Sequence, residues 1–330
     1  MKLISFNSYK GGACRTTTCY NVLPYLALEL GATSKQPIIV VDCDLDSMGL
    51  TNIFHAEDDP EERKEKLPYS AKHLFIKDKE NINERVDRGG LSGVLEDDWY
   101  FKHFEKVGNA LGLEDNGSVL FLGVDKHERT ISDDDYDSKE KFAQNAPVNI
   151  LIKRLEALDD DDMPKAVVFD CAAGVQMTTV AIYKNVALSV LCMRPTLQFR
   201  IGTRDYLYSM LPGQLNTSLE EDPKIVLLPT SVAAVEEAEG EAADALAKLR
   251  SDTIKEIRKS VVNFIMFKSK NGELDYTLIP EMAEVDCFGL PEIERFKWQE
   301  CLLFKEKELT KQELELQKQY KKLVEILARN

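Results

Sequence analysis

Residues 8–18 read SYKGGACRTTT, and a short β-type run, KLISFNS (2–8), leads directly into this stretch. It continues into TTTCYNVLPYLALELGA (16–32), whose apolar residues recur at helical spacing. A glycine pair between a strand and a helix lets the backbone curl so that several N–H groups converge at the positive end of the helix. The stretch therefore predicts a phosphate-binding loop. The residues expected to contact the phosphates are Lys10, Gly11, Gly12, Ala13, Cys14, Arg15, Thr16 and Thr17.

Three acidic residues stand at the ends of two further apolar runs. The run QPIIVVDCD ends in Asp42 and Asp44, and the run KAVVFDCAAG contains Asp170, four residues before Gly174. Carboxylates at the carboxyl ends of parallel strands point into the crevice where ligands bind. There they can hold Mg²⁺ and orient an attacking water. We therefore expect a metal site formed by Thr16, Asp44 and Asp170, with Asp42 beside it.

Apolar runs typical of buried strands alternate with helical patterns along the chain. Further strands are predicted at 117–124, 186–195, 223–231 and 274–282, and helices at 99–112, 149–158, 233–267 and 305–330. This alternation predicts an α/β protein, a three-layer sandwich with a mostly parallel, doubly wound sheet. The chain contains no convincing linker and no internal repeat, so we expect one domain over 1–330, with variable insertions near 55–115 and 233–275.

Charge and composition restrict the possible functions. The net charge of −15 disfavours nucleic-acid binding unless a local basic patch exists. The seven cysteines include no CxxC pair, which argues against a disulfide framework and a zinc ribbon. No run approaches about 18 apolar residues, so no membrane span is predicted and a cytoplasmic protein is expected. The histidines are scattered and suggest neither a metal cluster nor a catalytic triad: His55, His73, His103 and His127.

Several motifs together resemble one family. YKGGACRTTT is similar to the deviant Walker A loop of the ParA/MinD-type ATPases of the SIMIBI class, whose pattern is Lys-Gly-Gly-x-x-Lys-Ser/Thr. IIVVDCDLDSMGLT resembles their switch I strand, and AVVFDCAAG their Walker B and switch II segment. TLIPEM resembles the late Ile-Pro motif, and YKKLVEILA the C-terminal helix. The resemblance covers nearly the whole chain in order, and it implies a P-loop NTPase fold with ATP and Mg²⁺ as ligands.

The resemblance also implies roles for individual residues. Lys10 matches the signature lysine, which in the family reaches phosphates bound by the other subunit of an ATP-sandwich dimer. Thr16 matches the hydroxyl that binds magnesium. Asp44 matches the switch I acid that supports hydrolysis, Asp170 the Walker B acid and Gly174 the switch II glycine. Lys10 and Asp44 are therefore the expected catalytic residues.

Some positions depart from the family pattern. Arg15 stands where the second lysine is usual; it preserves the positive charge, and it resembles a branch whose switch I is like DCDLDSMGLT. Cys14 replaces a glycine, and its side chain could narrow the site. Pro229 and Thr230 stand where the family often has an Asn that reads adenine. Pro280, in the Ile-Pro motif, is expected to contact the nucleotide.

Three functional interpretations remain open at this point. The first is a slowly hydrolysing ATP switch that forms a nucleotide-dependent homodimer and controls a protein partner encoded nearby. The second is a nucleotide-binding scaffold without turnover, and the third is a DNA-partition ATPase. The biological process could be partition, positioning at the cell surface or anti-phage defence.

Overall fold

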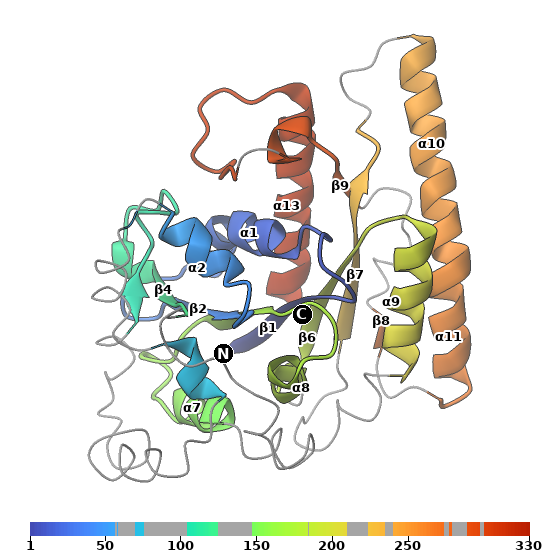
Figure 1. Ribbon diagram of the computed structural model, residues 1–330. Helices are drawn as coiled ribbons and strands as arrows, with labels where there is room; N and C mark the ends of the chain where they lie inside the picture. The colour runs from blue at the N-terminus through green and yellow to red at the C-terminus, as the bar shows by residue number, and fades with distance from the viewer. Residues whose placement is uncertain are drawn as a thin grey trace.

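The computed structural model describes residues 1–56, 58, 70–75, 104–124, 147–183, 185–209, 224–234, 240–273, 277–278, 289–297 and 300–330. The strands are β1 (Lys2–Ser8), β2 (Ile38–Cys43), β3 (Glu105–Lys106), β4 (Val119–Leu122), β5 (Ala166–Cys171), β6 (Leu188–Met193), β7 (Lys224–Val232), β8 (Thr277–Leu278) and β9 (Leu290–Pro291). They form a central sheet in the order β3-β4-β2-β5-β1-β6-β7-β8, and β9 pairs with the carboxyl end of β7 (Figure 1).

The sheet is parallel except at one edge, where β3 pairs antiparallel with β4. β1 lies between β5 and β6, with Phe6 opposite Asp170 and Ser8 opposite Cys192. Because parallel strands end at the same edge of a sheet, the loop after β1 and the acids of β2 and β5 come together there. The predicted doubly wound sheet is confirmed.

Helices cover both faces of this sheet (Figure 1). They are α1 (Arg15–Glu29), α2 (Gly49–Phe54), α7 (Pro147–Glu156), α8 (Met177–Tyr183), α9 (Leu197–Ser209), α10 (Glu241–Ile257), α11 (Asn263–Lys270) and α13 (Lys311–Arg329). In β2, Ile38 and Val40 pack in one cluster with α1 and α13, whereas Ile39 and Val41 pack in another with α7 and α8. Burial on both faces explains why these strands read as continuous apolar runs.

The layer beside β6 and β7 is built by α9 and the segment from α10 to α11. A π-helical turn, Arg258–Val262, joins α10 to α11 and packs with α9 against these two strands. The helix-rich segment predicted at 233–267 is confirmed from Glu241 to residue 267, whereas Ala233 and Ala234 are not helical. The three-layer sandwich is therefore complete on both sides of the sheet.

The helix predicted at 99–112 is wrong over the described residues 104–112. Glu105–Lys106 forms the edge strand β3, and a turn follows it. Phe104 is buried toward the α7 layer, whereas Val107 and Leu111 are buried toward α1. Pairing with β4 and burial on two sides override the helical spacing of the apolar residues.

The C-terminal helix begins later than the predicted residue 305, at Lys311. Thr310 caps it: the Glu313 N–H donates to the Thr310 hydroxyl, and the Thr310 N–H donates to the Glu313 carboxylate at 2.9 Å. The strand predicted at 274–282 is present as β8, while Pro280, His103 and His127 lie outside the described residues. Within the described part of the chain, no helix is long and apolar enough to cross a membrane.

Candidate functional site

The loop between β1 and α1 turns sharply before the helix begins at Arg15. Gly12 has φ +80° and Cys14 has φ 55°, both in the left-handed region. Glycine adopts this conformation freely, whereas Cys14 adopts it at a steric cost. Gly174, which follows β5 with φ +78°, donates its N–H to the Ser8 carbonyl at 2.9 Å. The glycine-containing segments singled out in the sequence therefore meet at the carboxyl edge of the sheet.

The Arg15 side chain pairs with two acids at this edge. Its Nε donates to Asp170 Oδ1 at 2.8 Å, and its Nη2 donates to Asp44 Oδ2 at 2.9 Å. Burial would lower the pKa of Arg15, but the charge of Asp170 and the hydrogen bond to Asp44 raise it. The guanidinium therefore stays charged, and it ties the start of α1 to β5 and to the segment after β2.

The two acids respond differently to this environment. Burial acts to raise the pKa of Asp44, but hydrogen bonds from Ser47 and Arg15 outweigh it, and the net pKa is lowered. Asp170 is fully buried, and burial raises its pKa although Arg15 and Thr16 both favour its ionised form. Asp44 is therefore held as a carboxylate beside the loop.

Asp42 has a structural environment of its own. It is fully buried and accepts hydrogen bonds from the Thr51 N–H at 2.9 Å and the Thr51 hydroxyl at 2.8 Å. Burial and the nearby charge of Asp170 raise the pKa of Asp42 to about 7. Asp42 thus fixes the turn between β2 and α2, and through it the position of Asp44.

The expected metal ligands lie together around the Arg15 guanidinium. The Thr16 hydroxyl donates to Asp170 Oδ2 at 2.7 Å and lies 3.2 Å from Arg15 Nη2. These oxygens are the ligand type that Mg²⁺ prefers. No group of three or more His, Cys, Asp or Glu side chains that could hold a metal ion occurs in the described part of the chain. The residues thus fit a Mg²⁺ ion that is held by a hydroxyl, one or two carboxylates and substrate phosphates, as is usual for this ion.

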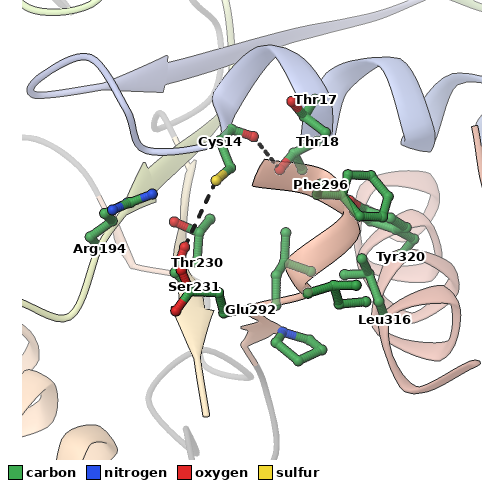
Figure 2. A pocket seen from close by; sticks show the side chains of 13 residues that line it. Cys14, Thr17, Thr18, Arg194, Thr230, Ser231, Glu292, Phe296, Leu316 and Tyr320 are labelled. Carbon is green, nitrogen blue, oxygen red and sulfur yellow. Dashed lines mark hydrogen bonds between the residues drawn. The ribbon is translucent and has the colours of Figure 1, made fainter. Parts of the chain in front are cut away.

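A pocket opens on the other side of the α1 start (Figure 2). Its lining combines polar side chains, those of Cys14, Thr17, Thr18, Arg194, Thr230, Ser231 and Glu292, with apolar ones, those of Leu290, Pro291, Ile293, Phe296, Leu316 and Tyr320. Figure 2 shows Arg194, Cys14, Thr230 and Ser231 at one end and Phe296, Leu316 and Tyr320 at the other. It encloses about 550 Å³ of space, part of it open to solvent. A slot with one polar and one apolar end suits a ligand with a charged group and a flat ring.

The carboxyl end of β7 holds the loop from the pocket side. The buried Thr230 hydroxyl donates to the Ala13 carbonyl at 3.0 Å, and it also lies 3.2 Å from the Met193 carbonyl. Cys14 Sγ lies 3.8 Å from the Ser231 hydroxyl, at the mouth of the pocket. The Thr230 hydroxyl is thus engaged by main-chain carbonyls, and Cys14 forms part of the pocket lining.

The structure distributes the residues predicted from sequence over two sides of the α1 start. Thr16, Asp44 and Asp170 contact Arg15 on one side, and Cys14 and Thr17 line the pocket on the other. Lys10 is exposed on the loop, and Gly11 has nothing within 4 Å of the point where a Cβ would lie.

Arg194 lines the pocket and was not predicted as a site residue. It directly follows β6, which pairs with β1 on one side and with β7 on the other. The sequence signal for Arg194 is a cation directly after an apolar run, and the pairing of that run with β1 is visible only in the fold.

Comparison with known proteins shows what this chain is similar to. The sequence matches no protein-family model, and it matches no curated protein. The fold is similar to that of pNOB8 ParA bound to nonspecific DNA, with a TM-score of 0.52 and 16% identity over 99% of this chain and 97% of that one. It is also similar to the MinC:MinD complex of Aquifex aeolicus, with a TM-score of 0.51 and 14% identity over 98% and 95%. An ATP complex of Cyanothece McdA gives a TM-score of 0.51 and 13% identity over 99% and 96%. The chain therefore has the fold of the ParA/MinD-type P-loop ATPases.

Proposed function

We propose that this protein is an ATP-dependent molecular switch that binds Mg-ATP, dimerises around it and controls a partner protein. The observation that carries the proposal is the meeting of the glycine loop, Thr16, Asp44 and Asp170 at the carboxyl edge of one parallel sheet. The similarity in fold to ParA, MinD and an ATP-bound McdA supports nucleotide binding at this edge.

The residues of the site divide the chemistry between them. Main-chain N–H groups of the loop and the start of α1 bind the phosphates, because they converge at the positive end of the helix. When bound by Thr16, Asp44 and Asp170, Mg²⁺ supplies positive charge to the phosphate oxygens. Asp44 orients the attacking water, since its lowered pKa keeps it ionised. Lys10, which is exposed, adds positive charge at the nucleotide of the second subunit.

Arg15 has to change partners for this reaction. In the structure its guanidinium is paired with both carboxylates that would hold Mg²⁺. Two cations would compete for the same oxygens, so a bound Mg²⁺ would require Arg15 to give up one or both of these carboxylates. This exchange adds an energy cost to the reaction, and it agrees with a slow intrinsic ATPase.

Phosphate release by the purified protein tests the proposal. We expect slow Mg²⁺-dependent release of phosphate from ATP by the wild type, and no release by Asp44→Ala, which loses the group that orients the water. Asp46→Ala is the matched control, because Asp46 is an exposed acid two residues away. If calorimetry detects ATP binding by the wild type but no phosphate release occurs, even with the partner present, the protein is a nucleotide-binding scaffold without turnover.

The DNA-partition alternative takes support from the fold of ParA bound to nonspecific DNA. The net charge of −15 opposes it, because phosphate backbones repel an acidic surface. A gel-shift titration of the ATP-bound protein with duplex DNA, repeated at low and high salt, separates the two functions. We expect no shift at physiological salt, and a cytoplasmic protein partner as the regulated component, in a positioning or anti-phage system.

A further inference from the structure

We propose that Arg194 is the cation that binds the phosphates of the nucleotide from the pocket side of the loop. The inference rests on the proposed nucleotide-binding function, and it adds a phosphate-binding residue outside the Walker-type motif. It follows from three observations: the position of Arg194 in the sheet, the absence of a hydrogen-bond partner for its Nε, and the engagement of Arg15 elsewhere in the ligand-free protein.

The position of Arg194 is fixed by strand register. In the β1–β6 pair, Ser8 lies opposite Cys192, so Arg194 leaves the sheet beside the loop that follows β1. In the β6–β7 pair, Met193 lies opposite Pro229, so Arg194 also lies beside the end of β7. Figure 2 shows its guanidinium at the polar end of the pocket, directed toward Cys14. A phosphate bound at the start of α1 is therefore on the side that Arg194 faces.

One buried donor of the Arg194 side chain lacks a hydrogen-bond partner in the described structure. Its Nε is buried and makes no hydrogen bond, and the described residues include no acid paired with its guanidinium. A buried donor without an acceptor costs free energy, so such a group calls for an explanation. An anionic ligand in the pocket would supply the acceptor, and a guanidinium binds phosphate oxygens through a planar fork of donors.

Arg15 is held away from the pocket. Its guanidinium is shared by Asp44 and Asp170, on the opposite side of the α1 start. The positive charge of Arg15 is thus balanced by two carboxylates. The pocket lining offers Arg194 only one acid, Glu292, which is exposed. The apolar end of the pocket leaves room for the base, so the charged end receives the phosphates.

Calorimetric titrations with Mg-ATP and with tripolyphosphate test the inference. We expect Arg194→Ala to weaken binding of both ligands by about 10- to 100-fold, because it removes charge-assisted hydrogen bonds. Arg194→Lys should recover part of the loss, since it restores the charge without the fork. Arg329→Ala is the matched control, as this arginine is exposed at the end of α13. Without ligand, Arg194→Ala should melt close to the wild-type temperature, because the Nε donor makes no hydrogen bond that could be lost.

The outcomes separate this inference from the proposed function. Wild-type affinity of Arg194→Ala for ATP overturns the role of Arg194 and leaves the ATP switch intact. Weakened ATP binding with unchanged tripolyphosphate binding also overturns it, because the contact would then be to the base or ribose. If the wild type binds tripolyphosphate but not ATP, and Arg194→Ala loses that binding, the inference stands and the proposed function fails. If the wild type binds neither ligand, both are overturned.

Discussion

Arg15 has two possible sets of partners: the carboxylates of Asp44 and Asp170 in the ligand-free protein, and the phosphates in the proposed nucleotide complex. It is buried and bridges Asp44 and Asp170, so it joins α1, β5 and the segment after β2 through one side chain. The same side chain is the loop cation that the resemblance assigns to the phosphates. Because one guanidinium cannot serve both sets of oxygens, the proposed binding of Mg-ATP would be coupled at this residue to the stability of the ligand-free protein.

We therefore expect Arg15→Met to destabilise the ligand-free protein. The substitution keeps most of the apolar stem but leaves two buried carboxylates without their cation, which costs about 3–5 kcal/mol. Urea unfolding in EDTA, followed by circular dichroism, measures the loss. Added Mg²⁺ should restore part of the stability of Arg15→Met while changing the wild type little. A loss below about 1 kcal/mol in EDTA would show that the two acid pairs contribute little.

The sequence predicted the residues of the loop but not the pairing between them. Gly11, Gly12 and Thr16 are recognisable because a phosphate loop is a local motif between a strand and a helix. The contacts of Arg15 and Arg194 depend on which strands become neighbours, and the spacing of residues along the chain does not contain that information. For Cys14, the position in the loop could be predicted from the sequence, but the left-handed conformation of its backbone could not.

At the scale of the elements, buried strands were predictable and edge elements were not. The runs that became β2, β5, β6 and β7 are largely apolar on both faces, which leaves little choice of structure. β1 differs, because Ser5 and Asn7 are buried polar residues on one of its faces. The edge strand β3 contains only Glu105 and Lys106, and the apolar residues around it are spaced as in a helix. The start of α13 could have been found, because Thr310 and Glu313 form a capping box that is visible in the sequence.

One contact between elements makes stability depend on pH. His55 ends α2; its Nδ1 lies 2.7 Å from Asp58 Oδ2, and its Nε2 lies 3.0 Å from Glu105 Oε2 of β3. Burial would lower the pKa of His55, but the two carboxylates outweigh it, and the pKa is raised above 6.5. A raised pKa means that the folded state holds this proton more tightly than the unfolded chain. The contribution of His55 to stability is therefore complete below about pH 6.5, the ordinary His pKa, and is lost as the pH rises through the folded-state pKa.

We expect the free energy of unfolding of the wild type to fall, relative to that of His55→Gln, as the pH rises above about 6.5, the ordinary His pKa. The glutamine keeps a polar side chain but cannot take up the proton. Urea titrations at half-unit pH steps provide the comparison, and the difference between the two proteins is the quantity to follow. Parallel pH curves for the two proteins would contradict the assignment of this ion pair.

At the scale of the whole molecule, exposed apolar side chains gather beside the loop. Tyr9, Leu197 and Ile201 are 37%, 61% and 40% exposed, respectively. Tyr9 lies against the helix α9, which carries Leu197 and Ile201. Its ring packs so closely on Gly202 of α9 that a Cβ on Gly202 would lie 2.0 Å from the ring. Lys10, the residue expected to reach a second subunit, is adjacent to Tyr9. The edge of the sheet at which the proposed nucleotide-binding residues lie therefore also presents an apolar surface with a cation beside it.

This arrangement predicts where the proposed nucleotide-dependent dimer would form. Leu197→Asp should weaken the ATP-induced dimer by more than about tenfold, because it places a charge in an apolar contact and 1.4 kcal/mol corresponds to a factor of ten. Its affinity for ATP should remain unchanged, since Leu197 does not line the pocket. Leu28→Asp is the matched control: Leu28 is 62% exposed at the far end of α1, away from the loop. Sedimentation velocity with ATP and with ADP measures the dimer, and Lys10→Ala should behave like Leu197→Asp. If both Asp variants dimerise as the wild type does, the second subunit binds another face, and Lys10 cannot reach its nucleotide.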